Sequence, residues 1–185
     1  MHSPTILAME TAGAESLNAS LLAKEMITLD KITSQATSLG CARVTETTFK
    51  YGQRGNVRSV VLPDAEAAMG CWRLADDERI MVELACGINV ALCYDGRLEK
   101  ALGRPVKPDD KVVVVLCGGS NVTSSMLCDW RREYAYIDEE TQRRSDSALG
   151  SEKGEDEETV PSELTKPIVL EGVEVPCGEA CEGCA

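Results

Sequence analysis

Apolar and β-branched residues in the first part of the chain gather in two kinds of stretch, short ones of strand length and longer ones with helical spacing. The short runs predict strands at residues 5–9, 41–45 and 57–62, and a very short one at 80–82. Helical spacing predicts a short helix near residues 17–22, one from Asp30 to Gly40, a long one after Pro63 and Asp64, and one over residues 83–94. Strands alternating with helices predict an α/β fold, a three-layer and mostly parallel sheet.

The most distinctive stretch is a valine run that leads into a glycine-containing loop. Residues 112–116 are apolar without alternation, which predicts a strand buried on both faces of a parallel sheet. After Cys117, Gly118 and Gly119 let the backbone turn tightly and approach a ligand, and Thr123 can begin a helix. Open α/β sheets hold ligands at the carboxyl ends of parallel strands. Taken alone, however, a Gly-Gly turn is usually only a turn.

Charge divides the chain into two parts. The net charge is −12, of which −10 falls in residues 138–185 and −2 remains in residues 1–137. We therefore expect a folded domain over residues 1–137 and an acidic, disordered tail over 138–185. Neither part has the basic footprint of a nucleic-acid binder. The apolar runs are shorter than the ~20 residues of a membrane-spanning helix, and no secretory signal is predicted.

Nine cysteines raise the question of a disulfide scaffold. Six are scattered singly through apolar sequence, where a free thiol behaves as a small hydrophobic group, and reduced thiols imply a cytoplasmic protein. The other three, Cys177, Cys181 and Cys184, have a spacing that can bind zinc or an iron–sulfur cluster. No fourth ligand is near them, so an incidental cysteine-rich tail is the default interpretation.

Four short motifs of the sequence resemble the PLP-dependent serine dehydratases of the fold-type II, tryptophan-synthase-β-like family. They are residues 8–14, 30–34 and 82–87 and the Cys117 loop. The resemblance implies β-elimination of water from L-serine or L-threonine, which gives a 2-oxo acid and ammonia, with pyridoxal 5'-phosphate as cofactor. It implies that the Cys117 thiol meets the pyridine nitrogen, beside Gly118 and Gly119. It also implies a homodimer acting on a small amino-acid substrate.

The same resemblance implies a monovalent cation, potassium or sodium, held by oxygen atoms. Its ligands would be the Glu10 carboxylate, the Ala14 carbonyl, the Ser16 hydroxyl and the carbonyls of Leu39 and Cys41. Ligation by oxygen alone with one formal charge suits such an ion. Without the resemblance, Glu10 is simply a surface carboxylate at a strand end and Leu39 part of a helix core.

The sequence also departs from the family. None of its eight lysines stands in the Ser-Phe-Lys context of a Schiff-base lysine, and no glycine-rich phosphate loop is present. We therefore hypothesise the carboxyl-terminal half of a serine dehydratase, from a fragmentary or split gene, that is inactive alone. A non-catalytic paralogue or regulatory partner of an intact dehydratase is the alternative. A nucleotide-binding domain using Gly118 and Gly119 ranks last, because G-x-G-x-x-G is missing.

Overall fold

The computed structural model describes residues 4–139 and 168–169 of the chain. β1 (Ile6–Thr11) and β2 (Val57–Leu62) pair in parallel, with Ile6 opposite Val57 and Thr11 opposite Leu62. β3 (Ile168–Val169) pairs in parallel with β2, so the order in the sheet is β1-β2-β3. Within the described part of the chain, one edge of β1 is therefore open.

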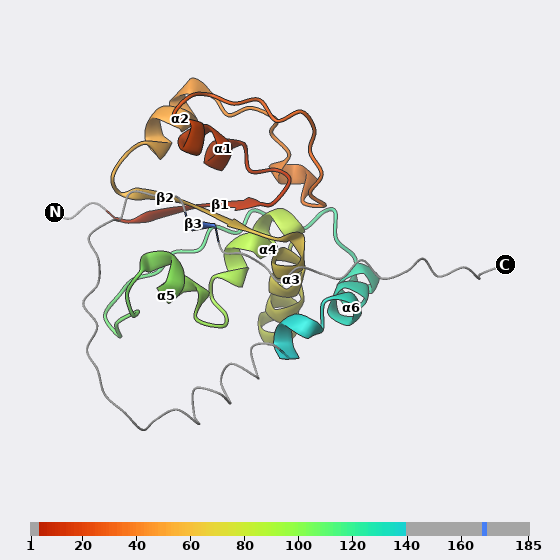
Figure 1. The fold of residues 1–185 in the computed structure, drawn as a ribbon. Helices are drawn as coiled ribbons and strands as arrows, with labels where there is room; N and C mark the ends of the chain where they lie inside the picture. The colour runs from red at the N-terminus through yellow and green to blue at the C-terminus, as the bar shows by residue number, and fades with distance from the viewer. Residues whose placement is uncertain (1–3, 140–167, 170–185) are drawn as a thin grey trace.

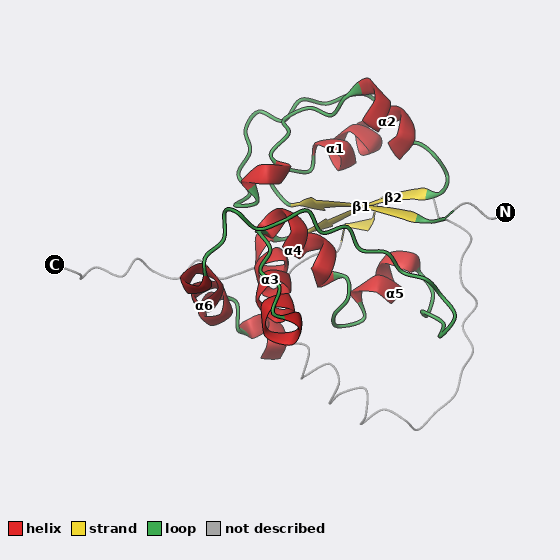
Figure 2. Cartoon of the chain, turned by 180° about the vertical axis from the view of Figure 1, so that it is seen from behind, coloured by secondary structure: helices red, strands yellow, loops and turns green. Residues whose placement is uncertain are grey.

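Helices cover both faces of this sheet, as Figure 1 shows and Figure 2 repeats from behind. On one face lie α1 (Ser16–Ala23) and α2 (Glu46–Gly52). On the other lie α3 (Asp64–Glu78), α4 (Leu84–Ala91), α5 (Arg97–Leu102) and α6 (Ser124–Glu133). The predicted three-layer α/β fold with a parallel sheet is confirmed. The strands predicted at residues 5–9 and 57–62 and the helix after Pro63 are confirmed as β1, β2 and α3.

The core lies between β2 and the pair α3 and α4, which approach each other unusually closely. A Cβ atom on Gly87 would lie 2.1 Å from the Ala67 carbonyl oxygen, and one on Gly70 would lie 2.2 Å from the Gly87 carbonyl oxygen. The two helices therefore touch backbone to backbone, which a side chain at either position would prevent. This contact fixes the amino end of α4, and with it the buried Cys86, against α3.

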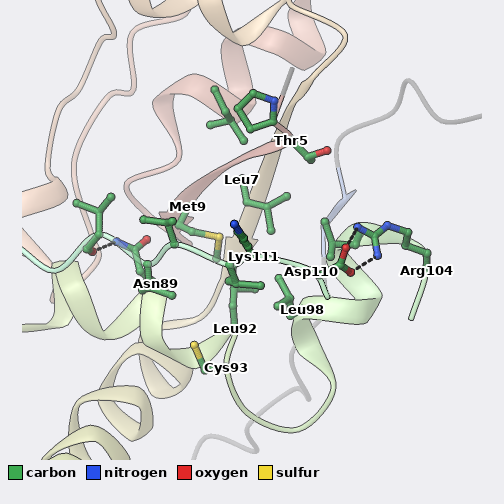
Figure 3. Close-up of a pocket in the computed structure, with 17 residues that line it drawn as sticks. Thr5, Leu7, Met9, Asn89, Leu92, Cys93, Leu98, Arg104, Asp110 and Lys111 are labelled. Carbon is green, nitrogen blue, oxygen red and sulfur yellow. Dashed lines mark hydrogen bonds and ion pairs between the residues drawn. The ribbon is translucent and has the colours of Figure 1, made fainter. Parts of the chain in front are cut away.

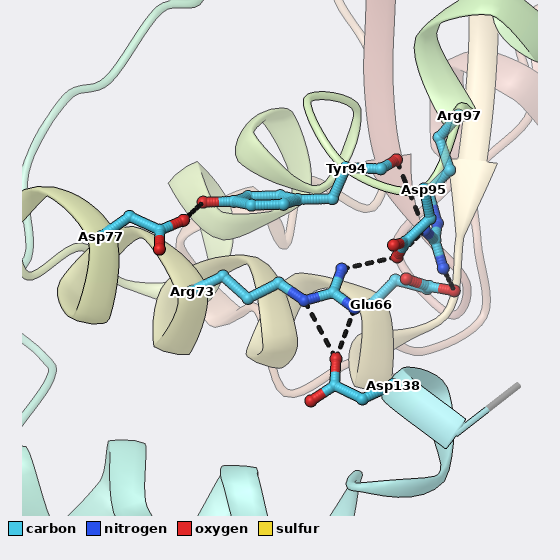
Figure 4. Close-up of polar contacts among 7 residues, drawn as sticks. All are labelled: Glu66, Arg73, Asp77, Tyr94, Asp95, Arg97 and Asp138. Carbon is cyan, nitrogen blue, oxygen red and sulfur yellow. Dashed lines mark hydrogen bonds and ion pairs between the residues drawn. The ribbon is translucent and has the colours of Figure 1, made fainter. Parts of the chain in front are cut away.

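Charged side chains tie α3 to the turn between α4 and α5 (Figure 4). The Arg73 guanidinium lies 2.6 Å from the Asp95 carboxylate and also pairs with Asp138. Arg97 pairs with the same Asp95 and with Glu66. Burial by itself would raise the pKa of Asp95, but hydrogen bonds and charges from the two arginines lower it overall. Both arginines thus hold the carboxylate in its ionised form.

The strand predicted at residues 112–116 is wrong. The segment is irregular, and the side chains of Val113 and Val115 are 86% and 64% exposed. A strand needs a neighbouring ladder, and among the described strands none pairs with this segment. The Asn89 side-chain amide instead donates to the Val115 carbonyl at 3.0 Å. High β-propensity records how well a residue fits a sheet and does not create one.

The helix predicted from Asp30 to Gly40 is also wrong, and only the short 3-10 turn η1 (Thr37–Leu39) forms there. The Asp64 carboxylate accepts hydrogen bonds from the Ser34 hydroxyl at 2.6 Å and from the Gln35 N–H at 2.7 Å. Because the Gln35 N–H is bonded to Asp64, it does not make the backbone bond of a helix, and the segment stays irregular. The strands predicted at residues 41–45 and 80–82 do not form either. At the end of the first, Thr45 caps α2 by accepting from the Thr48 N–H at 3.1 Å.

Candidate cofactor site

The loop formed by Cys117, Gly118 and Gly119 is held against the amino end of α4. The Gly118 carbonyl accepts from the N–H of Glu83, the residue that precedes this helix, at 3.2 Å. The Cys117 N–H donates to Cys86 Sγ at 3.1 Å. The loop is therefore positioned by α4, although the strand predicted before it is absent.

The two glycines of the loop have different roles. Gly118 has a φ of +150°, which side-chain-bearing residues rarely adopt, and no atom lies within 4 Å of where its Cβ would be. A Cβ on Gly119 would lie 2.6 Å from the Met81 carbonyl oxygen. Gly119 thus lets the loop pack on the chain before α4, whereas Gly118 leaves open space beside the exposed Cys117.

These features fit the ring of the cofactor that the sequence resemblance implies. A flat aromatic ring can approach backbone that carries no side chain, and the space beside Gly118 is open. A thiol has both a hydrogen and lone pairs, so Cys117 can hydrogen-bond a pyridine nitrogen in either protonation state. The three residues predicted to border the ring are contiguous, and Cys117 and Gly118 are exposed.

Glu10, at the end of β1, uses both carboxylate oxygens to cap α1. It accepts from the N–H groups of Leu17 and Asn18, each at 2.8 Å. Burial raises the pKa of Glu10, while these two backbone donors lower it and the nearby Glu15 raises it, and the net change is upward. A partly buried carboxylate with a raised pKa gains from any additional positive charge placed nearby.

The five predicted cation ligands lie in two segments of the structure. Glu10, Ala14 and Ser16 share the turn from β1 into α1, where the Ala14 carbonyl accepts from the Ser16 N–H at 3.0 Å. Leu39 and Cys41 lie at the end of η1, and the Leu39 carbonyl accepts from the Cys41 N–H at 2.7 Å. Close by the first segment, the Gly13 carbonyl accepts from the Thr33 N–H at 3.0 Å.

A groove of about 560 Å³ runs between the open edge of β1 and the irregular valine segment (Figure 3). Leu7 and Met9 line it from β1, and Val113 and Val115 line it from the other side. The Ile6 N–H donates to the carbonyl of Asn56, just before β2, and the Ala12 N–H donates to that of Leu62 at its end. Because hydrogen-bonding direction alternates along a strand, the N–H groups of Leu7 and Met9 point towards the open edge and this groove.

Sequence reasoning missed Cys86 and Glu83 as site residues. Both belong to the motif at residues 82–87, but the sequence predicts Cys86 only as an ordinary buried thiol. The hydrogen bonds from Cys117 to Cys86 and from Glu83 to Gly118 join two segments that are far apart in sequence. The only sequence signal for this contact is that two of the motifs that resemble the family, residues 82–87 and the Cys117 loop, each contain a cysteine.

Two absences hold for residues 4–139 and 168–169, the part of the chain that the structure describes. Among them, no three His, Cys, Asp or Glu side chains gather as a metal site, and no helix has the length and apolar character needed to cross a membrane. Cys177, Cys181 and Cys184 lie outside the described residues, as does most of the tail predicted over 138–185.

Comparison with known proteins gives one consistent result. Residues 1–118 match the family model described as pyridoxal-phosphate dependent enzyme. The chain is 45% identical over 128 residues to a serine dehydratase-like protein of Rattus norvegicus, covering 68% of this chain and 39% of that protein. It is 41% identical over 119 residues to an L-serine dehydratase of Saccharomyces cerevisiae, covering 64% of this chain and 35% of that protein.

A solved structure agrees with these matches. The fold is similar to that of a fungal L-serine ammonia-lyase from Rhizomucor miehei, with a TM-score of 0.65 and 30% identity, over 69% of this chain and 40% of that one. The chain thus spans well under half the length of these three relatives.

Proposed function

Since this chain belongs to the family of pyridoxal-phosphate dependent enzymes, we propose that it forms part of an L-serine ammonia-lyase. The reaction would convert L-serine, or L-threonine, to the 2-oxo acid and ammonia. The observation that carries this proposal is the Cys117 loop, which leaves an exposed thiol and an open glycine side by side. The identity to proteins named serine dehydratase supports the substrate class.

When bound, pyridoxal phosphate would act as an electron sink for the bonds at the substrate's Cα. The residues of this chain would position the ring rather than react. The Cys117 thiol would meet the pyridine nitrogen, and Gly118 would allow the ring to approach the backbone. The bonds from Cys117 to Cys86 and from Glu83 to Gly118 would keep the loop in place as substrate enters.

The chain by itself would not catalyse the reaction. Each of its eight lysines lies outside a Ser-Phe-Lys context, and the sequence has no glycine-rich phosphate loop. The test is the absorbance spectrum of the purified chain with pyridoxal phosphate, followed by borohydride reduction and tryptic mapping. We expect no reduced adduct confined to one lysine and no pyruvate from L-serine. A single modified lysine together with pyruvate release would overturn this part of the proposal.

The catalytic role of the loop is tested separately in a chimera. Residues 4–139 of this chain replace the matching part of the yeast L-serine dehydratase, and pyruvate formation is measured. We expect activity in the chimera, a loss of at least about tenfold with Cys117→Ala, and little change with the exposed Cys128→Ala on α6. A chimera that binds the cofactor but forms no pyruvate from L-serine or L-threonine would exclude the proposed reaction.

The open edge of β1 would be covered by the portion of the dehydratase fold that this chain does not match. The groove is lined on both sides by apolar side chains. The N–H groups of Leu7 and Met9 on β1 point towards it. An added strand there would complete hydrogen bonds on β1 and bury the exposed valines. A homodimer of the complete enzyme and a cytoplasmic location belong to the same proposal.

Glu10 would hold a potassium or sodium ion together with oxygens of Ala14, Ser16, Leu39 and Cys41. The raised pKa of Glu10 supports this, because a cation beside this partly buried carboxylate would offset the cost of its desolvation.

A non-catalytic partner of an intact dehydratase is the second candidate, favoured by the same open edge of β1. In that case, adding the purified chain to an active dehydratase would change the enzyme's rate or its sedimentation. No effect of the chain at a tenfold excess would exclude this candidate.

A further inference from the structure

Cys86 and Cys117 meet at the amino end of α4 although 31 positions separate them in sequence. The backbone nitrogen of Cys117 lies 3.1 Å from Cys86 Sγ. Covalent geometry keeps a cysteine's own sulfur about 3–4 Å from its backbone nitrogen, at a distance set by the χ1 rotamer. Rotation of the exposed Cys117 side chain can therefore carry its sulfur towards that of Cys86. A disulfide requires about 2 Å between the two sulfurs.

The two thiols differ in their exposure to solvent. Cys117 is exposed, so a small oxidant can reach it, whereas Cys86 is only 2% exposed. The space around Gly118 is open, which gives the loop room to adjust to a covalent link. A third thiol, Cys71 on α3, is fully buried and close enough to interact with Cys86. The accessible sulfur is thus Cys117, and Cys86 is the buried sulfur that its backbone contacts.

We propose that Cys86 and Cys117 form an oxidisable pair that closes to a disulfide when the chain reacts with hydrogen peroxide. In the first step the Cys117 sulfur attacks a peroxide oxygen and the O–O bond breaks. This gives a sulfenic acid on Cys117 and one water. In the second step the Cys86 sulfur attacks the Cys117 sulfur, the S–O bond breaks and a second water leaves. Together the thiols lose two electrons and two protons, and hydrogen peroxide is reduced to two waters.

The effect on catalysis rests on the proposed function, whereas the disulfide itself does not. If the Cys117 thiol meets the cofactor ring, the disulfide removes its hydrogen and ties the loop down onto α4. Oxidation would then weaken cofactor binding, and a dithiol reductant would restore it. Through this reversible disulfide, the binding of the cofactor would depend on whether peroxide has oxidised the pair.

The test uses the full chain with a Cys93→Ser/Cys128→Ser background. Both replaced cysteines are exposed, and their removal leaves one cysteine in each of the tryptic peptides 80–97 and 112–131. The protein is treated with hydrogen peroxide, alkylated under native conditions and mapped without reduction. We expect the two peptides to be joined, with loss of alkylated Cys117 and its recovery after dithiothreitol. The wild-type chain is treated in parallel, with the bond located by fragmentation, in case the background variant fails to fold.

Two variants decide the pairing. Cys86→Ala should abolish the joined peptide, and Cys71→Ala should leave it unchanged. The proposal is overturned if Cys117 is only converted to its sulfinic or sulfonic acid, if peptide 59–73 joins 80–97 through Cys71, or if the links join separate molecules. If the disulfide forms but the yeast chimera forms no pyruvate, the oxidisable pair stands and only the proposed function fails.

Discussion

Arg73 on α3 and Asp95 in the turn before α5 form an ion pair of 2.6 Å in which both side chains are largely buried, 13% and 15% exposed. The same guanidinium reaches Asp138, beyond α6, so one side chain joins three separate parts of the chain. Withdrawing two charges from water costs desolvation energy that their pairing offsets, so losing one partner leaves the other buried charge without compensation.

We predict that Arg73→Met lowers the free energy of unfolding by about 2–4 kcal/mol, because it leaves Asp95 with a single arginine and releases Asp138. Urea denaturation followed by circular dichroism measures this. The matched control is Arg132→Met, which breaks the pair with Asp129 on α6, where the two side chains are 76% and 62% exposed. That change should cost less than about 1 kcal/mol. Equal losses in the two variants would contradict a special role for Arg73.

The lowered pKa of Asp95 predicts a pH dependence. A carboxyl group whose pKa falls on folding stabilises the protein above its ordinary pKa of 3.8, and this contribution is lost as pH falls through the lower folded value. Asp95→Asn should therefore be less stable than the wild type at pH 6, and the difference should shrink as pH falls below 3.8. A difference that stays constant down to pH 2.5 would show that ionisation of Asp95 is not its cause.

The backbone contact between α3 and α4 predicts that Gly87→Ala destabilises the fold. The added methyl would meet the Ala67 carbonyl oxygen at 2.1 Å, so the helices must separate, at a cost of about 1–3 kcal/mol or more. Gly55→Ala is the control, because nothing lies within 4 Å of that position. Its effect should stay within about 1 kcal/mol. Thermal unfolding of both variants checks this, and similar melting temperatures would contradict the close contact.

The parallel pair β1 and β2 and the helix α3 could be predicted because their signals are local. Residues 57–62 are mostly valine and leucine and end in an apolar run at 60–62, and Ala65, Ala68 and Met69 repeat at helical spacing behind Pro63. The valine segment carried an equally strong local signal, yet it is not a strand. Strand formation depends on a neighbour, and no other described strand pairs with residues 112–116. The bonds of α3 lie within its own segment, whereas a strand also needs a partner that local pattern does not supply.

The candidate site was predicted in part. The loop residues Cys117, Gly118 and Gly119 could be selected because they stand together in sequence. Their anchors could not, since the bonds to Glu83 and Cys86 join segments more than 30 positions apart. The Asp30 helix failed for a similar reason. The Asp64 carboxylate, a distant acceptor, takes the Gln35 N–H and the Ser34 hydroxyl, and no local pattern reveals such competition.

The proposed cation site predicts specific stabilisation by potassium or sodium. A cation present at ten times its dissociation constant adds about 1.4 kcal/mol to the free energy of unfolding. We expect the melting temperature to rise in potassium or sodium chloride relative to tetramethylammonium chloride of equal ionic strength. Glu10→Gln should remove the difference, and the exposed Glu46→Gln on α2 should keep it. If Glu10→Gln responds like the wild type, Glu10 is not a ligand.

The exposed valines beside the open edge of β1 predict self-association of the purified chain. Val113 and Val115 together present an apolar surface next to unpaired strand edge, which favours contact between copies when no partner covers it. The double variant Val113→Lys/Val115→Lys should sediment with less associated material at the same concentration. Its unfolding free energy should change by less than about 1 kcal/mol, because neither side chain is buried.

The control for this last prediction adds the same charge elsewhere. Thr47→Lys/Gln53→Lys places two lysines at exposed positions on and beside α2, on the opposite face of the sheet. If charge alone governs association, both double variants will associate less than the wild type. If the groove governs it, only the valine variant will. A wild-type chain that sediments as a monomer at every concentration would show that the open edge does not bind a second copy. The proposed partner would then have to be a different polypeptide.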